Sequence, residues 1–152
     1  MNQNDNPLVW HYTAKQHLTN ITKEELLKVS KVEKELGLKA SLWFSRDQYW
    51  EPTACKVGFG SFKDPKESLM YQHTLLGAAR IGVNEENFSF IGWDDYCKVS
   101  KDDPRVLDAM LKKGIESGAK KDNWLCLFQN IPATKWDSVQ IFDGKEWKDL
   151  PE

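Results

Sequence analysis

The sequence predicts an α+β fold: a split sheet, mixed or antiparallel, with flanking helices and a C-terminal β-hairpin. Three observations support this prediction. Strand-like segments lie at residues 8–13, 40–45, 78–83 and 124–129. Amphipathic helical segments separate them at irregular intervals, whereas a doubly wound parallel sheet needs regular alternation of strands and helices. An Asp143-Gly144 turn joins the last two strand-like segments.

Length and composition indicate one globular domain over residues 1–152, with the polar residues 1–6 as a flexible tail. Hydrophobic residues make up 40% and charged residues 29% of the chain, as is typical of globular proteins. The net charge of −2 argues against general nucleic-acid binding. Because the chain has neither a signal-peptide pattern nor a long apolar run, we expect a cytoplasmic protein without a membrane partner.

The three cysteines, Cys55, Cys97 and Cys126, predict neither a disulfide framework nor a metal site. Their number is odd, and no Cys-x-x-Cys pair occurs among them. We therefore expect reduced, buried thiols and no bound metal.

The first predicted strand, residues 8–13, alternates between two faces. Trp10 and Tyr12 share one face with Leu8, while His11 shares the other with Val9 and Thr13. On the residues alone, the favoured interpretation of His11 is a buried histidine bonded to backbone. A helix is predicted to begin after this strand. The capping-box pattern Thr22 to Glu25 predicts a further helix to about residue 36, with Gly37 as its C-cap.

The stretch 40–54 contains the densest group of chemically active side chains. Its apolar start predicts a strand ending at Ser45, and a turn then leads to Trp50-Glu51-Pro52-Thr53-Ala54. We expect this strand to lie beside the first one. Because both strands end in a hydroxyl residue, at Thr13 and Ser45, the two ends are predicted to flank one cleft.

The remaining elements follow from local signals. Pro65 begins a predicted helix to residue 76, and Pro104 begins another that ends near Gly118. A central strand is predicted at residues 124–129, and a hairpin of type I′ character at 136–150. The strand 78–83 carries Arg80 in an apolar run. The residues leave a structural salt bridge and a ligand clamp equally open for Arg80, with Glu51 as a plausible carboxylate partner.

Five motifs together resemble a known superfamily: His-Tyr-Thr at 11–13, Trp-Phe-Ser at 43–45, the stretch 50–54, residues 79–83, and a late Trp-rich strand with Ile-Pro and a terminal hairpin. The set is similar to a group of small uncharacterised bacterial and phage proteins with an ADP-ribosyltransferase-like fold. The resemblance extends from Trp10 to Trp147. It implies NAD as a substrate, no metal, and transfer of ADP-ribose to an unknown macromolecular target.

Carried over to this chain, the resemblance makes His11 the residue that holds the nicotinamide-side ribose of NAD. Tyr12 and Thr13 follow it in the cofactor-binding strand, and Ser45 matches the hydroxyl residue that braces the site. These assignments come from the resemblance, and residue spacing alone does not give them.

The resemblance also implies a carboxylate near the ribose, because breaking the nicotinamide–ribose bond builds positive charge on that sugar. The superfamily takes its catalytic Glu from a late strand, where this chain offers no match. Glu51, beside the second strand motif, is therefore the expected carboxylate. Trp50 is expected to form a wall of the cleft, and Arg80 to bind the pyrophosphate.

Two alternatives remain open at this stage. One is a module that binds ADP-ribose or a nucleotide without cleaving it, in a phage–host conflict. The other is an RNA 2′-phosphotransferase-like activity, which works with His and Arg residues, here Arg46 or Arg80, and needs no Glu.

Overall fold

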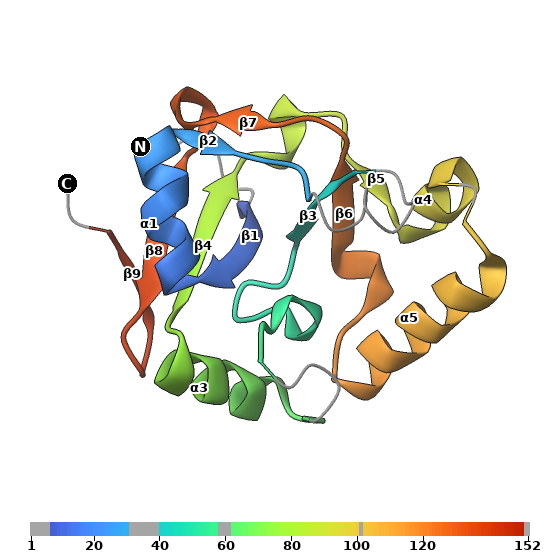
Figure 1. The fold of residues 1–152 in the computed structure, drawn as a ribbon, viewed down its shortest axis with the longest axis horizontal. Helices are drawn as coiled ribbons and strands as arrows, with labels where there is room; N and C mark the ends of the chain where they lie inside the picture. Colours follow the sequence, from blue (N-terminus) through green and yellow to red (C-terminus); the bar gives the residue numbers. More distant parts are fainter. Residues whose placement is uncertain (1–6, 31–39, 58–61, 101, 151–152) are drawn as a thin grey trace.

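A computed structural model describes residues 7–30, 40–57, 62–100 and 102–150, and confirms the α+β class. Within these ranges the main sheet has seven strands in the order β5-β6-β3-β1-β4-β8-β9, and every pairing is antiparallel (Figure 1). The strands are β1 (Val9–Ala14), β3 (Leu42–Ser45), β4 (Ala78–Val83), β5 (Ile91–Gly92), β6 (Trp124–Leu127), β8 (Ser138–Phe142) and β9 (Trp147–Asp149).

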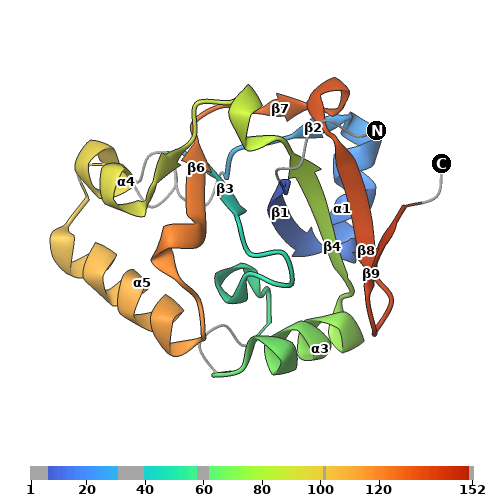
Figure 2. The same cartoon turned by 180° about the vertical axis from the view of Figure 1, so that it is seen from behind.

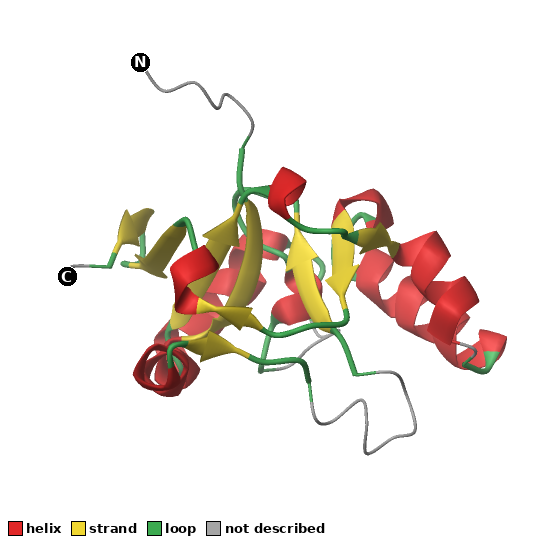
Figure 3. Cartoon of the chain, turned by 90° about the horizontal axis from the view of Figure 1, so that it is seen from above, coloured by secondary structure: helices red, strands yellow, loops and turns green. Residues whose placement is uncertain are grey.

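Local signals begin and end the helices much as the sequence predicts. The described α-helices are α1 (Lys15–Glu24), α3 (Pro65–Leu75), α4 (Trp93–Ser100) and α5 (Pro104–Glu116). Asp64 and Asp103 cap α3 and α5 by accepting a backbone N–H two residues on, and a proline follows each cap. Figures 1 and 3 show α4 and α5 at one end of the sheet and the β8–β9 hairpin at the other.

The prediction of a helix that starts at Thr22 is wrong over the described residues. The Thr22 hydroxyl donates back to the carbonyl of Leu18 at 3.0 Å, inside α1, and Glu25 ends that helix with a φ of 55°. The chain then forms β2 (Leu26–Leu27), which pairs with β7 (Ile131–Pro132). Burial of Leu27 in this second, two-stranded sheet outweighs the helical signal. Gly37 and the predicted tail at 1–6 lie outside the described residues.

The core lies on both faces of the sheet, and β1 contributes to both. Val9 packs with Phe44 and Ile81 on one face. Trp10 and Tyr12 pack on the other, against a group that includes Trp50, Leu69 and Phe142. The alternation predicted for the first strand is therefore confirmed. A third cluster, around Trp93, Tyr96, Trp124 and Cys126, joins α4 to β6.

The C-terminal hairpin forms as predicted, but its turn is not of type I′. That turn needs positive φ at both central residues, and Gly144 has a φ of 102° while Asp143 is not among the positive-φ residues. Four residues instead connect β8 to β9. The Asp143 carboxylate accepts the backbone N–H groups of Lys145 and Glu146 at 2.8 and 2.9 Å, which closes the turn from its own side chain.

Among the described residues, no helix is long and apolar enough to cross a membrane. The three cysteines are free thiols, and two of them, Cys55 and Cys126, are buried. The described part of the chain also contains no group of three or more His, Cys, Asp or Glu side chains placed to hold a metal ion.

Candidate functional site

The candidate site lies where β1 and β3 separate. They are neighbours in the sheet, as predicted, but one residue pair, Trp10 with Ser45, joins them (Figures 1 and 2). Because the strands are antiparallel, Ser45 lies beside the start of β1, and Thr13 lies toward its other end. Ser45 pairs with Trp10 and so shares the Trp10 face of the sheet, opposite the face of His11. The prediction that the strand ends at Thr13 and Ser45 flank one cleft is therefore wrong.

His11 bridges the two strands where the backbone ladder is missing. Its Nδ1 lies 2.8 Å from the carbonyl oxygen of Trp43. Burial lowers the pKa of His11 to about 4, although the bond to this carbonyl opposes the shift. The ring is therefore neutral at pH 7, and because a carbonyl only accepts, Nδ1 carries the proton.

The second ring nitrogen of His11 is left as an acceptor. Nε2 has no hydrogen-bond partner within the part of the chain that the structure describes, and the side chain is partly exposed. The bond to Trp43 fixes both the tautomer and the ring orientation. His11 thus presents one oriented lone pair, which suits a ligand hydroxyl or amide N–H.

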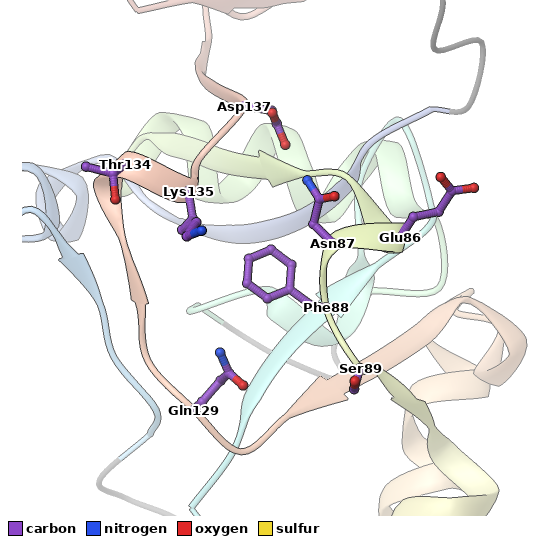
Figure 4. A pocket seen from close by; sticks show the side chains of 8 residues that line it. All are labelled: Glu86, Asn87, Phe88, Ser89, Gln129, Thr134, Lys135 and Asp137. Atoms are coloured by element: carbon purple, nitrogen blue, oxygen red, sulfur yellow. The ribbon is translucent and has the colours of Figure 1, made fainter.

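A series of aromatic rings continues from His11 across the same face. The ring centroids of His11 and Phe44 are 5.7 Å apart, those of Phe44 and Phe90 5.2 Å, and those of Phe90 and Phe88 6.0 Å. Phe88 lines a pocket of about 600 Å³ (Figure 4). We call it the Phe88 pocket; its other lining residues include Asn87, Gln129, Thr134, Lys135 and Asp137.

Glu51 and Ser45 come together, but inside the protein. The Glu51 carboxylate accepts hydrogen bonds from Ser45 Oγ at 2.8 Å and from the backbone N and Oγ1 of Thr53 at 3.1 and 2.6 Å. It caps the short 3₁₀ helix η1 (Pro52–Ala54), and Glu51 is 5% exposed. Burial raises the pKa of Glu51, and these hydrogen bonds offset part of the rise.

Arg80 is buried in a cage of aromatic and amide groups. Its guanidinium carbon lies 3.8 Å from the ring centre of Trp10 and 4.5 Å from that of Trp147. Nε and Nη2 donate to Gln140 Oε1 at 2.8 and 2.6 Å. Nη1 donates to the Tyr12 hydroxyl at 3.1 Å and to the carbonyl of Gln48 at 2.6 Å.

The predicted partnership of Arg80 with Glu51 is therefore wrong. Among the described residues, Arg80 forms no ion pair with any carboxylate. Four N–H donor bonds of the guanidinium go to neutral acceptors, and its face lies over the rings of Trp10 and Trp147, so the charge is stabilised without a counter-ion. Burial lowers the pKa of Arg80, with Tyr12 opposing the shift.

The other predicted cofactor residues also face the interior. The Tyr12 hydroxyl donates to the carbonyl of Asp47 at 2.6 Å, and burial raises its pKa. Trp50 is fully buried and donates from Nε1 to Ser68 Oγ at 2.8 Å. Thr13 is buried, and its carbonyl accepts from Gln72 Nε2 at 3.2 Å. Of the seven predicted site residues, His11 is the one with partial exposure.

Comparison with protein-family models, with curated proteins and with solved structures found no match. The geometry around His11 therefore carries the functional argument. Our sequence reasoning missed the Phe88 pocket, because its side chains come from short 3₁₀ helices and loops after β4, β6 and β7. The one available signal was a set of short polar turns between predicted strands, and such turns are common in all sheets.

Proposed function

We propose that this chain binds NAD, with the nicotinamide-side ribose at His11, as part of an ADP-ribosyltransferase-like activity. The observation that carries the proposal is the oriented, unpaired Nε2 of His11 at the point where β1 and β3 separate. A ribose hydroxyl can donate to this nitrogen. The partly buried ring of Phe90, which packs on buried Phe44 beside His11, offers apolar surface for the nicotinamide.

The main sheet supports the ADP-ribosyltransferase-like fold that is part of this proposal. The resemblance of the motifs leads us to expect a split sheet with a histidine on its first strand. The antiparallel sheet, with β1 and β3 joined by a single residue pair beside His11, agrees with that expectation. Fold likeness alone does not establish an activity. For this reason the proposal depends on the tautomer of His11 and on its unpaired Nε2.

Cleavage of NAD needs a carboxylate near the ribose, and Glu51 remains our candidate. Glu51 is bonded to Ser45 on the face of the sheet that Trp10 occupies, whereas His11 lies on the opposite face. To reach a ribose at His11, Glu51 has to leave its buried bonds and the chain around it has to rearrange. This closed arrangement favours a second candidate function: binding of NAD or ADP-ribose without cleavage. In that case Glu51 is a structural cap throughout.

The RNA 2′-phosphotransferase-like alternative has less support. It needs arginines that can reach a phosphate. Arg46 forms an ion pair with Glu85, with Nη2 and Oε2 2.6 Å apart, and Arg80 is caged in the interior. We do not propose it for this chain.

The test is NAD binding by calorimetry together with nicotinamide release by chromatography. We expect the wild type to bind NAD, and His11→Ala to weaken binding about tenfold, the effect of one lost hydrogen bond. His17→Ala, on the exposed side of α1, is the matched control and should bind normally. Nicotinamide release indicates the transferase, and intact NAD indicates the binding module. Absence of NAD binding by the wild type overturns the proposal.

A further inference from the structure

We propose that the Phe88 pocket is a binding site for a nucleoside unit, with the base stacked on Phe88 and read by the amides of Asn87 and Gln129. The carboxylate of Asp137 is placed at the rim for the sugar hydroxyls (Figure 4). The inference does not depend on His11. It concerns the chemical class of ligand that this face of the molecule recognises.

The first supporting observation is that four of the polar side chains around the pocket have no partner within the described part of the protein. Within the described residues, the side chains of Asn87, Gln129, Thr134 and Lys135 make no hydrogen bond or ion pair. All four are exposed. Each amide presents donors and an acceptor together, which is the complement of the edge of a nucleobase.

The second observation is that hydrogen bonds hold the surrounding loops in place. Asn84 N donates to Asp137 Oδ2 at 2.8 Å, and Asp137 N donates to the carbonyl of Gly82 in β4 at 2.9 Å. Asn130 Oδ1 accepts from Val29 N at 2.8 Å, which ties the turn beside Gln129 to the segment after β2. The unpaired side chains therefore extend from an ordered frame, and this lowers the entropy lost when a ligand binds.

Phe88 provides the stacking surface. It is half-buried and packs on the core beside Phe90, so its ring is held from below. In Figure 4 the ring lies between the side chains of Asn87, Lys135 and Gln129. An aromatic ring bordered by amides suits a flat heterocycle, because every base has a face that stacks.

The charge of the lining side chains and the volume of the pocket favour an uncharged nucleoside unit as the ligand. Glu86 and Asp137 bring two carboxylates to the pocket wall, against the single ammonium of Lys135. This balance disfavours a polyphosphate inside the pocket and suits hydroxyls that donate to carboxylates. The volume of about 600 Å³ falls in the range typical of small-molecule sites.

The experiment follows the side-chain amide signals of Asn87 and Gln129 in ¹⁵N-labelled protein while adenosine, guanosine, cytidine, uridine or NAD is added. We expect at least one nucleoside to shift both amides saturably. Phe88→Leu keeps an apolar side chain but removes the ring, and should weaken binding about tenfold. Gln129→Leu should weaken it as well, and because Gln129 is exposed and unpaired this variant should fold normally. Gln16→Leu on α1 is the control and should bind as the wild type does.

Two further arms identify the source of the nucleoside. If NAD displaces the bound nucleoside, the pocket takes the adenosine half of NAD; if both bind together, it takes a nucleoside of another substrate. The four nucleosides are titrated without NAD, so failure of the NAD proposal at His11 is distinguishable from failure of this one. Absence of amide shifts with all four nucleosides, or full affinity in both Phe88→Leu and Gln129→Leu, overturns the inference.

Discussion

His11 should make the stability of the protein depend on pH in a predictable direction. Its pKa is about 4 when folded and 6.5 in the unfolded chain, so the unfolded state binds a proton first as the pH falls. The stability that neutral His11 contributes is complete above pH 6.5 and decreases as the pH falls toward 4. The loss is at most about 3 kcal/mol. Urea unfolding at several pH values measures it.

The control for this prediction is His11→Asn, which retains an N–H donor for the Trp43 carbonyl and does not titrate. The difference in unfolding free energy between wild type and variant should change between pH 6.5 and pH 4 and stay constant above pH 7. If the difference does not vary with pH, His11 is not held neutral by burial.

Glu51 should contribute to stability in the opposite direction. Its raised pKa means that the folded state holds the proton more readily than the unfolded chain, so its contribution decreases as the pH rises through the folded pKa. We expect Glu51→Gln to be at least as stable as the wild type at pH 7, because Gln keeps an acceptor for Thr53 without a buried charge. Glu51→Ala should lose about 1–3 kcal/mol by leaving donors unpaired. Thermal and urea unfolding of both variants check this, and a strongly destabilised Glu51→Gln contradicts it.

At the scale of elements, Arg80 links β4 to β1, β8 and the loop after β3. Its planar guanidinium stacks on Trp10 and bonds to Gln140, a geometry that an ammonium cannot reproduce. We therefore expect Arg80→Lys to destabilise the protein by about 1–3 kcal/mol. NAD affinity of the folded variant should be unchanged. If Arg80→Lys has normal stability but binds NAD more weakly, Arg80 contacts the ligand and its structural role is contradicted.

The packing of α5 on β6 depends on a glycine. A Cβ at Gly114 would lie 2.9 Å from two ring carbons of buried Trp124 and 3.1 Å from Thr53 Cγ2. Alanine is the better helix former by about 1 kcal/mol, but overpacking costs about 1–3 kcal/mol. We expect Gly114→Ala to lower the unfolding free energy. Gly92→Ala, whose Cβ would meet nothing closer than 3.9 Å, is the control with little effect from crowding. A stabilised Gly114→Ala would contradict this packing.

Sequence reasoning worked for elements whose signals are local. The β4 prediction at residues 78–83 matches the structure, and the Asp-Pro starts of α3 and α5 fall where expected. It failed at Thr22, because β2 forms through pairing with Ile131, more than a hundred residues away. A local pattern contains no information about such a distant partner.

At the scale of the whole molecule, the predicted site residues show again that a local sequence pattern does not reveal a distant partner. Glu51 and Arg80 stood out as charged side chains among apolar ones, and both have their hydrogen bonds satisfied inside the protein. The sequence identifies such residues but cannot say whether another side chain or a ligand satisfies them. His11 differs, because one nitrogen is bonded and the other has no described partner.

The most direct test of the account is to observe the ring nitrogens of His11 by ¹⁵N NMR at pH 7, with and without NAD. We expect the neutral tautomer protonated at Nδ1 in the free protein. Saturating NAD should then shift Nε2, as expected when a hydroxyl donates to it, and leave Nδ1 on the Trp43 carbonyl. The ring of His17 should not change. A charged His11 ring at pH 7, or ring nitrogens that do not respond to saturating NAD, would contradict the central claim.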